Sequence, residues 1–161
     1  MLILIVGGIL LKEMIALAET QAPDWLSSLR LAVFYAVPHT GSPVATWGTY
    51  TLTKSVLGPH PATRDLHGSS RLFSLNETLR NHMDIHSCSL GETLPSPVPF
   101  LLGRYEYIVP PDASSPGFGI HKLIVNSSHV DICKPSSKED VRYTTLLQFV
   151  HCEKQHFSKE Y

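Results

Sequence analysis

Continuous apolar runs, broken by turns and by segments of helical periodicity, dominate the pattern of this chain. The first run covers residues 2–6 and is followed by Gly7-Gly8. An unbroken apolar run of this length is typical of a strand buried on both faces, and a glycine pair permits a tight turn. Residues 9–19 then have helical spacing, with one predicted apolar face made of Leu10, Met14 and Leu17. We therefore expect a strand, a turn and a helix over residues 1–19.

Strands and helices alternate through the rest of the chain. The pattern predicts strands at residues 31–37, 84–90, 104–109 and 122–125. It predicts helices at residues 72–82 and 136–157, the second because Ser136 and Glu139 have capping-box spacing. A stretch rich in Gly, Pro, Ser and His, residues 43–70, is expected to be irregular. Alternation of this kind indicates an α/β fold, with a mostly parallel sheet flanked by helices.

Composition narrows the class of protein. The 161 residues, 43% hydrophobic and 17% charged, suit a single globular domain. The net charge of −1 and the scattered Lys and Arg residues argue against a nucleic-acid partner. Three cysteines without paired spacing argue against a disulfide framework and against zinc, so we expect no metal and no cofactor. Residues 1–11 are short for a bilayer span, which favours a buried strand over the alternative of a membrane anchor.

The run at residues 123–126 leads into Ser127-Ser128-His129, which places a histidine in a short polar turn. A strand that delivers a histidine to the carboxyl edge of a parallel sheet is what an α/β-hydrolase needs for its general base. Asp112 follows the preceding predicted strand and is the favoured acid to orient that histidine. Glu92, at another strand end, is the alternative acid.

Three other residues have the chemistry for a site but a plainer interpretation. His39 and Ser42 follow the strand at residues 31–37, beside the edge where an active site would open. Ser42 is followed by Pro43 rather than by a helix, which favours a loop-capping role over a nucleophilic one. Cys133 follows the apolar residue Ile132, and we interpret it as a buried structural thiol.

Several of these segments occur together in one known family. The strand leading into Pro38-His39-Thr40-Gly41-Ser42 resembles the Pro-His-x-Gly-Ser signature of lipase-like α/β-hydrolases. The block His129-Val-Asp-Ile-Cys-Lys-Pro135, with Arg142-Tyr143 downstream, is similar to the closing block of the serine active site containing protein family. The resemblance runs collinearly from about residue 4 to the end of the chain.

The resemblance implies a lipase/esterase-like serine hydrolase. Family members are much longer, so the chain corresponds to the C-terminal half of an α/β-hydrolase, a single partial domain over residues 1–161 with the early strands missing. It also implies a membrane-associated location at the mitochondrion and endoplasmic reticulum, with a lipid or membrane surface as partner. The family is linked to phosphatidylglycerol remodelling and cholesterol trafficking. No protein partner is implied.

The chain departs from this family at the nucleophile. Hydrolases of this type carry their serine in a G-x-S-x-G elbow between a strand and a helix. Counting back from Gly7-Gly8, Ile5 occupies the serine's position, so the elbow is degenerate and the nucleophile is absent. We therefore expect a chain related to serine esterases but inactive as encoded. The alternative is a non-catalytic interaction or membrane-associated module.

Overall fold

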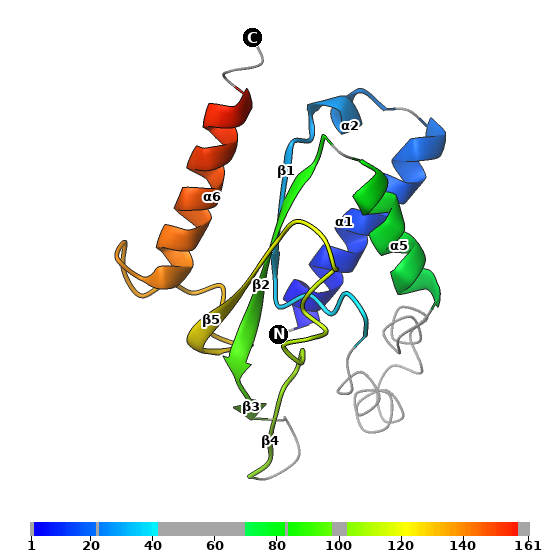
Figure 1. Ribbon diagram of the computed structural model, residues 1–161. Helices are drawn as coiled ribbons and strands as arrows, with labels where there is room; N and C mark the ends of the chain where they lie inside the picture. The colour runs from blue at the N-terminus through cyan, green and yellow to red at the C-terminus, as the bar shows by residue number, and fades with distance from the viewer. Residues whose placement is uncertain (1, 22, 42–69, 83, 98–102, 158–161) are drawn as a thin grey trace.

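The fold is described by a computed structural model over residues 2–21, 23–41, 70–82, 84–97 and 103–157 (Figure 1). Most of the predicted region 43–70 lies outside these residues. In chain order the elements are α1 (Leu2–Gln21), α2 (Asp24–Ser28), β1 (Leu31–Tyr35), α5 (Ser70–Asn81), β2 (His86–Leu94), β3 (Ser96–Pro97), β4 (Tyr105–Glu106), β5 (Ile120–Ser128) and α6 (Val141–Phe157).

A three-stranded parallel sheet forms the centre of the molecule. Its strand order is β1-β2-β5, with β2 hydrogen-bonded to both neighbours. Helices α1 and α5 lie side by side on one face, and α6 covers the other (Figure 1). Parallel strands require a connection that crosses a face of the sheet, and α5 lies in the connection from β1 to β2. The predicted α/β fold with a mostly parallel, helix-flanked sheet is confirmed.

Each face of the sheet has its own apolar cluster. On the α6 side, Phe149 packs with residues of β2 and β5, among them Leu90 and Ile124. On the other side, Ile15 of α1 and Leu79 of α5 pack against Phe34 of β1. The side chains of these residues are almost completely buried, so burial of apolar surface holds both helical layers to the sheet.

The strand predicted at residues 104–109 does not join the parallel sheet. Only Tyr105–Glu106 is extended, and it pairs antiparallel with β3. Ile108 and Val109, which gave the segment its strand-like pattern, are instead buried in the cluster on the α6 side. Burial in a core requires apolar side chains but not a strand.

The amino-terminal segment differs from its prediction. Residues 2–6 are not a strand, because α1 runs without interruption from Leu2 through Gly7-Gly8 to Gln21. A short apolar run cannot by itself distinguish a buried strand from a helix segment. At Gly8 the helix closely approaches the segment that follows β1: a Cβ atom there would lie 2.3 Å from a methyl carbon of Val37. The glycine serves helix packing rather than a turn.

The buried face of α1 is also not the predicted one. Leu10, Met14 and Leu17 are about half exposed, whereas Lys12, Ile15 and Ala18 are buried. Both sets have helical spacing, so periodicity alone did not distinguish them. No helix in the described part of the chain, α1 included, has the length and apolar character of a membrane span.

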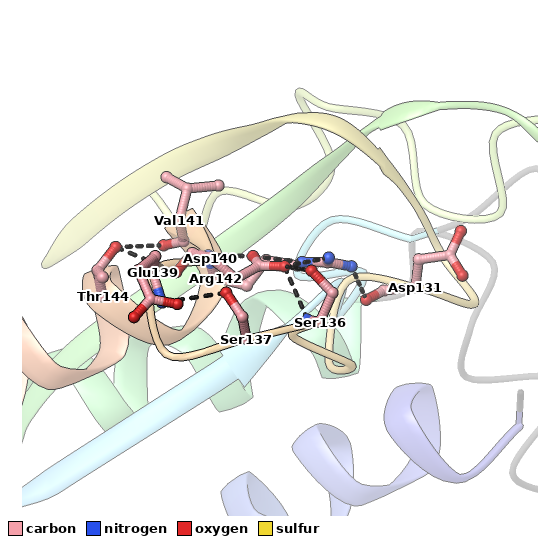
Figure 2. Close-up of polar contacts among 8 residues, drawn as sticks. All are labelled: Asp131, Ser136, Ser137, Glu139, Asp140, Val141, Arg142 and Thr144. Carbon is pink, nitrogen blue, oxygen red and sulfur yellow. Dashed lines mark hydrogen bonds and ion pairs between the residues drawn. The ribbon is translucent and has the colours of Figure 1, made fainter.

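Helix α6 begins five residues later than predicted. Asp140 precedes its first residue, and one carboxylate oxygen of Asp140 accepts the backbone N–H of Arg142 at 2.9 Å. The other oxygen accepts the N–H and the hydroxyl of Ser136 at 2.8 and 2.9 Å (Figure 2). Asp140 is therefore the capping residue, and Ser136 stabilises the loop in front of the helix.

The two adjacent glycines of α1 provide a test of its helical conformation. We expect Gly7→Ala to stabilise the protein by up to about 1 kcal/mol, because Gly7 is exposed in a helix with nothing within 4 Å of an added Cβ. We expect Gly8→Ala to destabilise it by about 1–3 kcal/mol, because the added methyl group overlaps Val37. Urea denaturation measures both. Destabilisation by Gly7→Ala would favour the turn that the sequence suggested.

Candidate functional site

The carboxyl ends of β2 and β5 bring a histidine and a glutamate together. Glu92 lies near the end of β2, and His129 follows the last residue of β5. The two strands are adjacent and parallel, so their carboxyl ends meet at one edge of the sheet. Both side chains are fully buried.

An irregularity in the pairing of β5 with β2 precedes His129. Glu92 lies opposite Ile124, but Leu94, two residues further on, lies opposite Ser128. Within the extra length of β5, Asn126 adopts a φ of 57°, a left-handed conformation that asparagine tolerates better than most residues. Bulges of this kind redirect the side chains that follow them. Here His129 comes directly after Ser128, the residue at which the pairing resumes.

Hydrogen bonds fix the pair from several directions. Nδ1 of His129 lies 2.8 Å from Oε2 of Glu92, and Oε1 of Glu92 accepts the backbone N–H of Val109 at 3.0 Å. The backbone N–H of His129 donates to the hydroxyl of Ser96 at 3.1 Å. Val109 thus contributes through its backbone, although it lies in no strand. Both carboxyl oxygens of Glu92 are satisfied, as a buried carboxyl group requires.

This geometry sets the chemistry available to His129. An ionised Glu92 has no hydrogen to donate, so Nδ1 carries the proton and Nε2 presents its lone pair. A histidine oriented by an acid in this way can accept a proton from a hydroxyl group. Among the described residues, Nε2 is buried and has no hydrogen-bond partner. The histidine–acid pair is assembled, but the structure places no serine hydroxyl against Nε2 of His129 within those residues.

Asp112, the favoured acid, is not placed beside His129. It lies in an exposed turn, where its backbone carbonyl accepts the N–H of Ser115 at 3.4 Å. The segment before it is only briefly extended and belongs to the β3–β4 pair. The structure therefore pairs His129 with Glu92, the alternative acid. Sheet order contained the useful signal, since the acid has to come from the strand that neighbours β5 in space.

His39 belongs to a second buried polar cluster, which includes Lys12 of α1. The amine of Lys12 lies 2.6 Å from Nδ1 of His39 and donates to Oδ1 of Asn76 at 2.7 Å. Asn76 in turn donates to the backbone carbonyl of His39 at 2.9 Å. The Lys12 amine also lies 5.4 Å from the ring centroid of Phe34. This cluster joins α1, α5 and the segment after β1, and no feature of the hydrophobic pattern indicated that Lys12 would be buried.

While Lys12 is protonated, the contact between His39 and Ser89 is not a nucleophile–base pair. Nε2 of His39 lies 3.2 Å from the hydroxyl of Ser89. A protonated Lys12 can only donate, so Nδ1 of His39 accepts and Nε2 carries the hydrogen. That tautomer donates to Ser89 rather than removing its proton. Burial and the neighbouring Lys12 lower the pKa of His39 to about 3, so the ring stays neutral at ordinary pH.

The other candidates do not add to the pair. Ser42 lies outside the described residues, as does the side chain of Ile5. Cys133 is half-buried rather than buried, and it is a free thiol. Among the residues that the structure describes, no three His, Cys, Asp or Glu side chains gather as a metal site would require.

The fold and the site together define an α/β protein with a buried histidine–acid pair at the carboxyl edge of a parallel sheet. Comparisons with known proteins show which proteins the chain is related to. No protein-family model matches the chain. No solved structure matches it either.

Curated relatives do match the chain. Protein SERAC1 of Danio rerio is 34% identical over 153 residues, covering 89% of this chain and 22% of the relative. The SERAC1 proteins of Bos taurus and Homo sapiens are each 28% identical over 155 residues, with the same coverage. The chain is thus homologous to SERAC1, serine active site-containing protein 1, over most of its length at modest identity, which supports membership of the SERAC1 family. It spans about a fifth of the length of these relatives.

Removing either acid tests which of them supports His129. We expect Glu92→Ala to lower the free energy of unfolding by about 2–4 kcal/mol, because it leaves a cavity and two buried N–H groups without an acceptor. We expect Asp112→Ala to change it by less than about 0.5 kcal/mol, because Asp112 is exposed. Urea denaturation at neutral pH measures both. Equal effects would contradict the pairing described here.

The buried amine of Lys12 predicts a dependence of stability on pH. Burial lowers its pKa from 10.5 to about 7 in the folded protein. Between these values the unfolded chain binds more protons, so stability rises with pH across this window, by at most about 1.4 kcal/mol per pH unit. Below about pH 7 both states are protonated and the burial penalty is present in full.

The matched variant for this measurement is Lys12→Met, which keeps a long apolar side chain but cannot titrate. We expect the difference in unfolding free energy between the parent protein and this variant to change in favour of the parent from pH 7 to pH 10. His39 does not interfere, because its pKa lies near 3 in the folded protein and 6.5 without perturbation, both below the window. A difference that is independent of pH would show that Lys12 is solvated.

Proposed function

We propose that this chain carries the histidine–acid half of a serine-esterase-like centre and does not itself cleave esters. The observation that carries the proposal is the state of His129. Glu92 orients its ring, and its Nε2 atom has no serine partner among the described residues. This is the proton-accepting half of a serine mechanism without its attacking oxygen.

Three further observations support the proposal. Ile5, at the position that the lipase-like resemblance gives to the serine, has no nucleophilic atom. The backbone around it is helical from Leu2 onward, whereas a nucleophile elbow needs a strand followed by a sharp turn. His129 is also fully buried, so substrate cannot reach its ring in this arrangement.

We also propose a biological setting for this centre. The lipase-like nature of the family, its links to phosphatidylglycerol remodelling and cholesterol trafficking, and a location at mitochondrial and endoplasmic reticulum membranes come from the resemblance. They concern proteins of which this chain spans 22%. We propose that the chain shares their setting and contacts a lipid or membrane surface.

A second candidate is a non-catalytic interaction or membrane-associated module. The half-exposed stripe of Leu10, Met14 and Leu17 along α1 favours it, because apolar side chains at helical spacing on a surface often mark a contact region. This function would not need His129. The histidine–acid half-centre is the better supported of the two, because its two residues form a specific and fully buried arrangement.

A fluorophosphonate probe tests for an activated serine. Such probes modify a serine hydroxyl that a neighbouring base has activated. We expect the purified full chain to show no labelling above that of its His129→Ala variant, and no hydrolysis of p-nitrophenyl esters. His151→Ala serves as the control, because His151 is an exposed histidine distant in sequence from the pair. Intact-protein mass spectrometry measures the added mass.

The contrary outcome is equally clear. Stoichiometric labelling of one serine that His129→Ala abolishes and His151→Ala preserves would show a complete centre. The proposal of an inactive half-centre would then be wrong, and peptide mapping would identify the nucleophile.

A further inference from the structure

The turn that carries His129 is connected to the first turn of α6. Within the turn, the N–H groups of Asp131 and Ile132 both donate to the carbonyl of Ser128, at 3.1 and 3.0 Å. The hydroxyl of Ser128 donates to the carboxylate of Asp131 at 2.5 Å. The contacts between Ser128 and Asp131 therefore close the turn that contains His129.

Arg142 links this turn to the helix. Its Nη1 atom donates to the backbone carbonyl of Asp131 at 2.7 Å, across eleven positions of sequence. The remainder of its guanidinium group is held by Asp140, with Nε bonded to Oδ1 at 2.8 Å and Nη2 bonded to Oδ2 (Figure 2). A two-point contact of this kind fixes the plane and the direction of the guanidinium group.

Helix stability alone does not explain an arginine at this position. The amino end of a helix carries a partial positive charge, so a cation in its first turn is unfavourable. Asp140 offsets that repulsion and also caps the helix through the N–H of Arg142. The cap would form equally well if residue 142 were neutral. What the arginine adds is its reach to Asp131.

The contact is built to persist. The side chain of Asp140 is 7% exposed and that of Arg142 is 17% exposed. The guanidinium of Arg142, together with the N–H groups of Ser136 and Arg142, holds the pKa of Asp140 well below its usual range. The carboxylate therefore stays ionised over the whole range in which the protein would be studied.

We infer that Arg142 is a positioning residue, which holds the turn at Ser128–Asp131 so that the ring of His129 stays against Glu92. The inference rests on the proposed function, because it treats this pair as the site. Arg142 makes no hydrogen bond to the ring of His129 or to Glu92. It acts through the carbonyl of Asp131, and the sequence block from His129 to Arg142 is thereby one structural unit.

Nuclear magnetic resonance of the full chain measures the effect directly. The Nδ1 proton of His129 is buried in its hydrogen bond to Glu92, and its resonance is identified by its loss in Glu92→Ala. We expect Arg142→Gln to speed exchange of this proton with water by about tenfold or more, because the turn opens more often without its charged tether. We expect a smaller increase for Arg142→Lys, which keeps the charge but not the two-point contact.

Thr144→Ala is the matched control. Thr144 lies in the same turn of α6 and its hydroxyl lies 3.2 and 3.3 Å from the carbonyls of Asp140 and Val141, without contact to the His129 turn. Its removal is expected to lower the melting temperature slightly and to leave the exchange of the His129 proton unchanged. The melting temperature of each variant separates local opening from general loss of stability.

Unchanged exchange in both Arg142 variants, with melting temperatures lowered as in Thr144→Ala, would overturn the inference and reduce Arg142 to a helix-capping role. If Arg142→Gln does not fold, Arg142→Lys decides. Failure of the proposed function looks different, because it appears as His129-dependent labelling of a serine in the parent protein. That result does not depend on any Arg142 variant.

Discussion

The position of β2 between two parallel neighbours is the constraint on which the rest of this structure depends. A strand that is paired on both edges and covered on both faces must carry side chains that fit a buried environment on each face. Leu90 faces the cluster beneath α6, and Ser89 meets His39. At its carboxyl end Glu92 meets the turn after β5. The two buried histidines, His39 and His129, therefore both have a contact on this one strand.

The two buried histidines show how a partner determines what an imidazole ring can do. At His129 the partner of Nδ1 is an acceptor, so Nε2 is left with a lone pair. At His39 the partner of Nδ1 is the amine of Lys12, which can only donate while it is protonated, so in that state Nε2 carries the hydrogen instead. Both rings are fully buried, but in these states Nε2 can accept a hydrogen bond in His129 and donates one in His39. The first has the form of a general base, whereas among the described residues it is the Nε2 atom of the second that has a serine hydroxyl beside it.

Sequence reasoning succeeded where one pattern had one structural meaning. The apolar run before Ser127 predicted a strand that delivers His129 to the sheet edge, and β5 does so. The helical pattern before His82 predicted α5 to within a few residues. The pattern failed at residues 2–6, where an apolar run suits strand and helix alike and the structure has helix α1.

The acid and the lysine were harder to predict because both depend on contacts distant in sequence. Asp112 is nearer than Glu92 to His129 in sequence, but β2 rather than β4 lies beside β5. The burial of Lys12 is unusual, since lysines are rarely buried without a partner. Its partners, His39 and Asn76, lie 27 and 64 positions away, and they provide neutral dipoles instead of a counter-ion.

The burial of Asn76 has a consequence for processing of the chain. Asn76-Glu77-Thr78 is the triplet that N-linked glycosylation enzymes accept. In the folded protein the amide nitrogen of Asn76 is buried and donates to His39, so it is closed to such an enzyme. A sugar could be joined there only before α5 docks, and its bulk would then keep α5 from reaching Lys12. An unmodified Asn76 is thus a condition for this fold, whichever compartment the chain is made in.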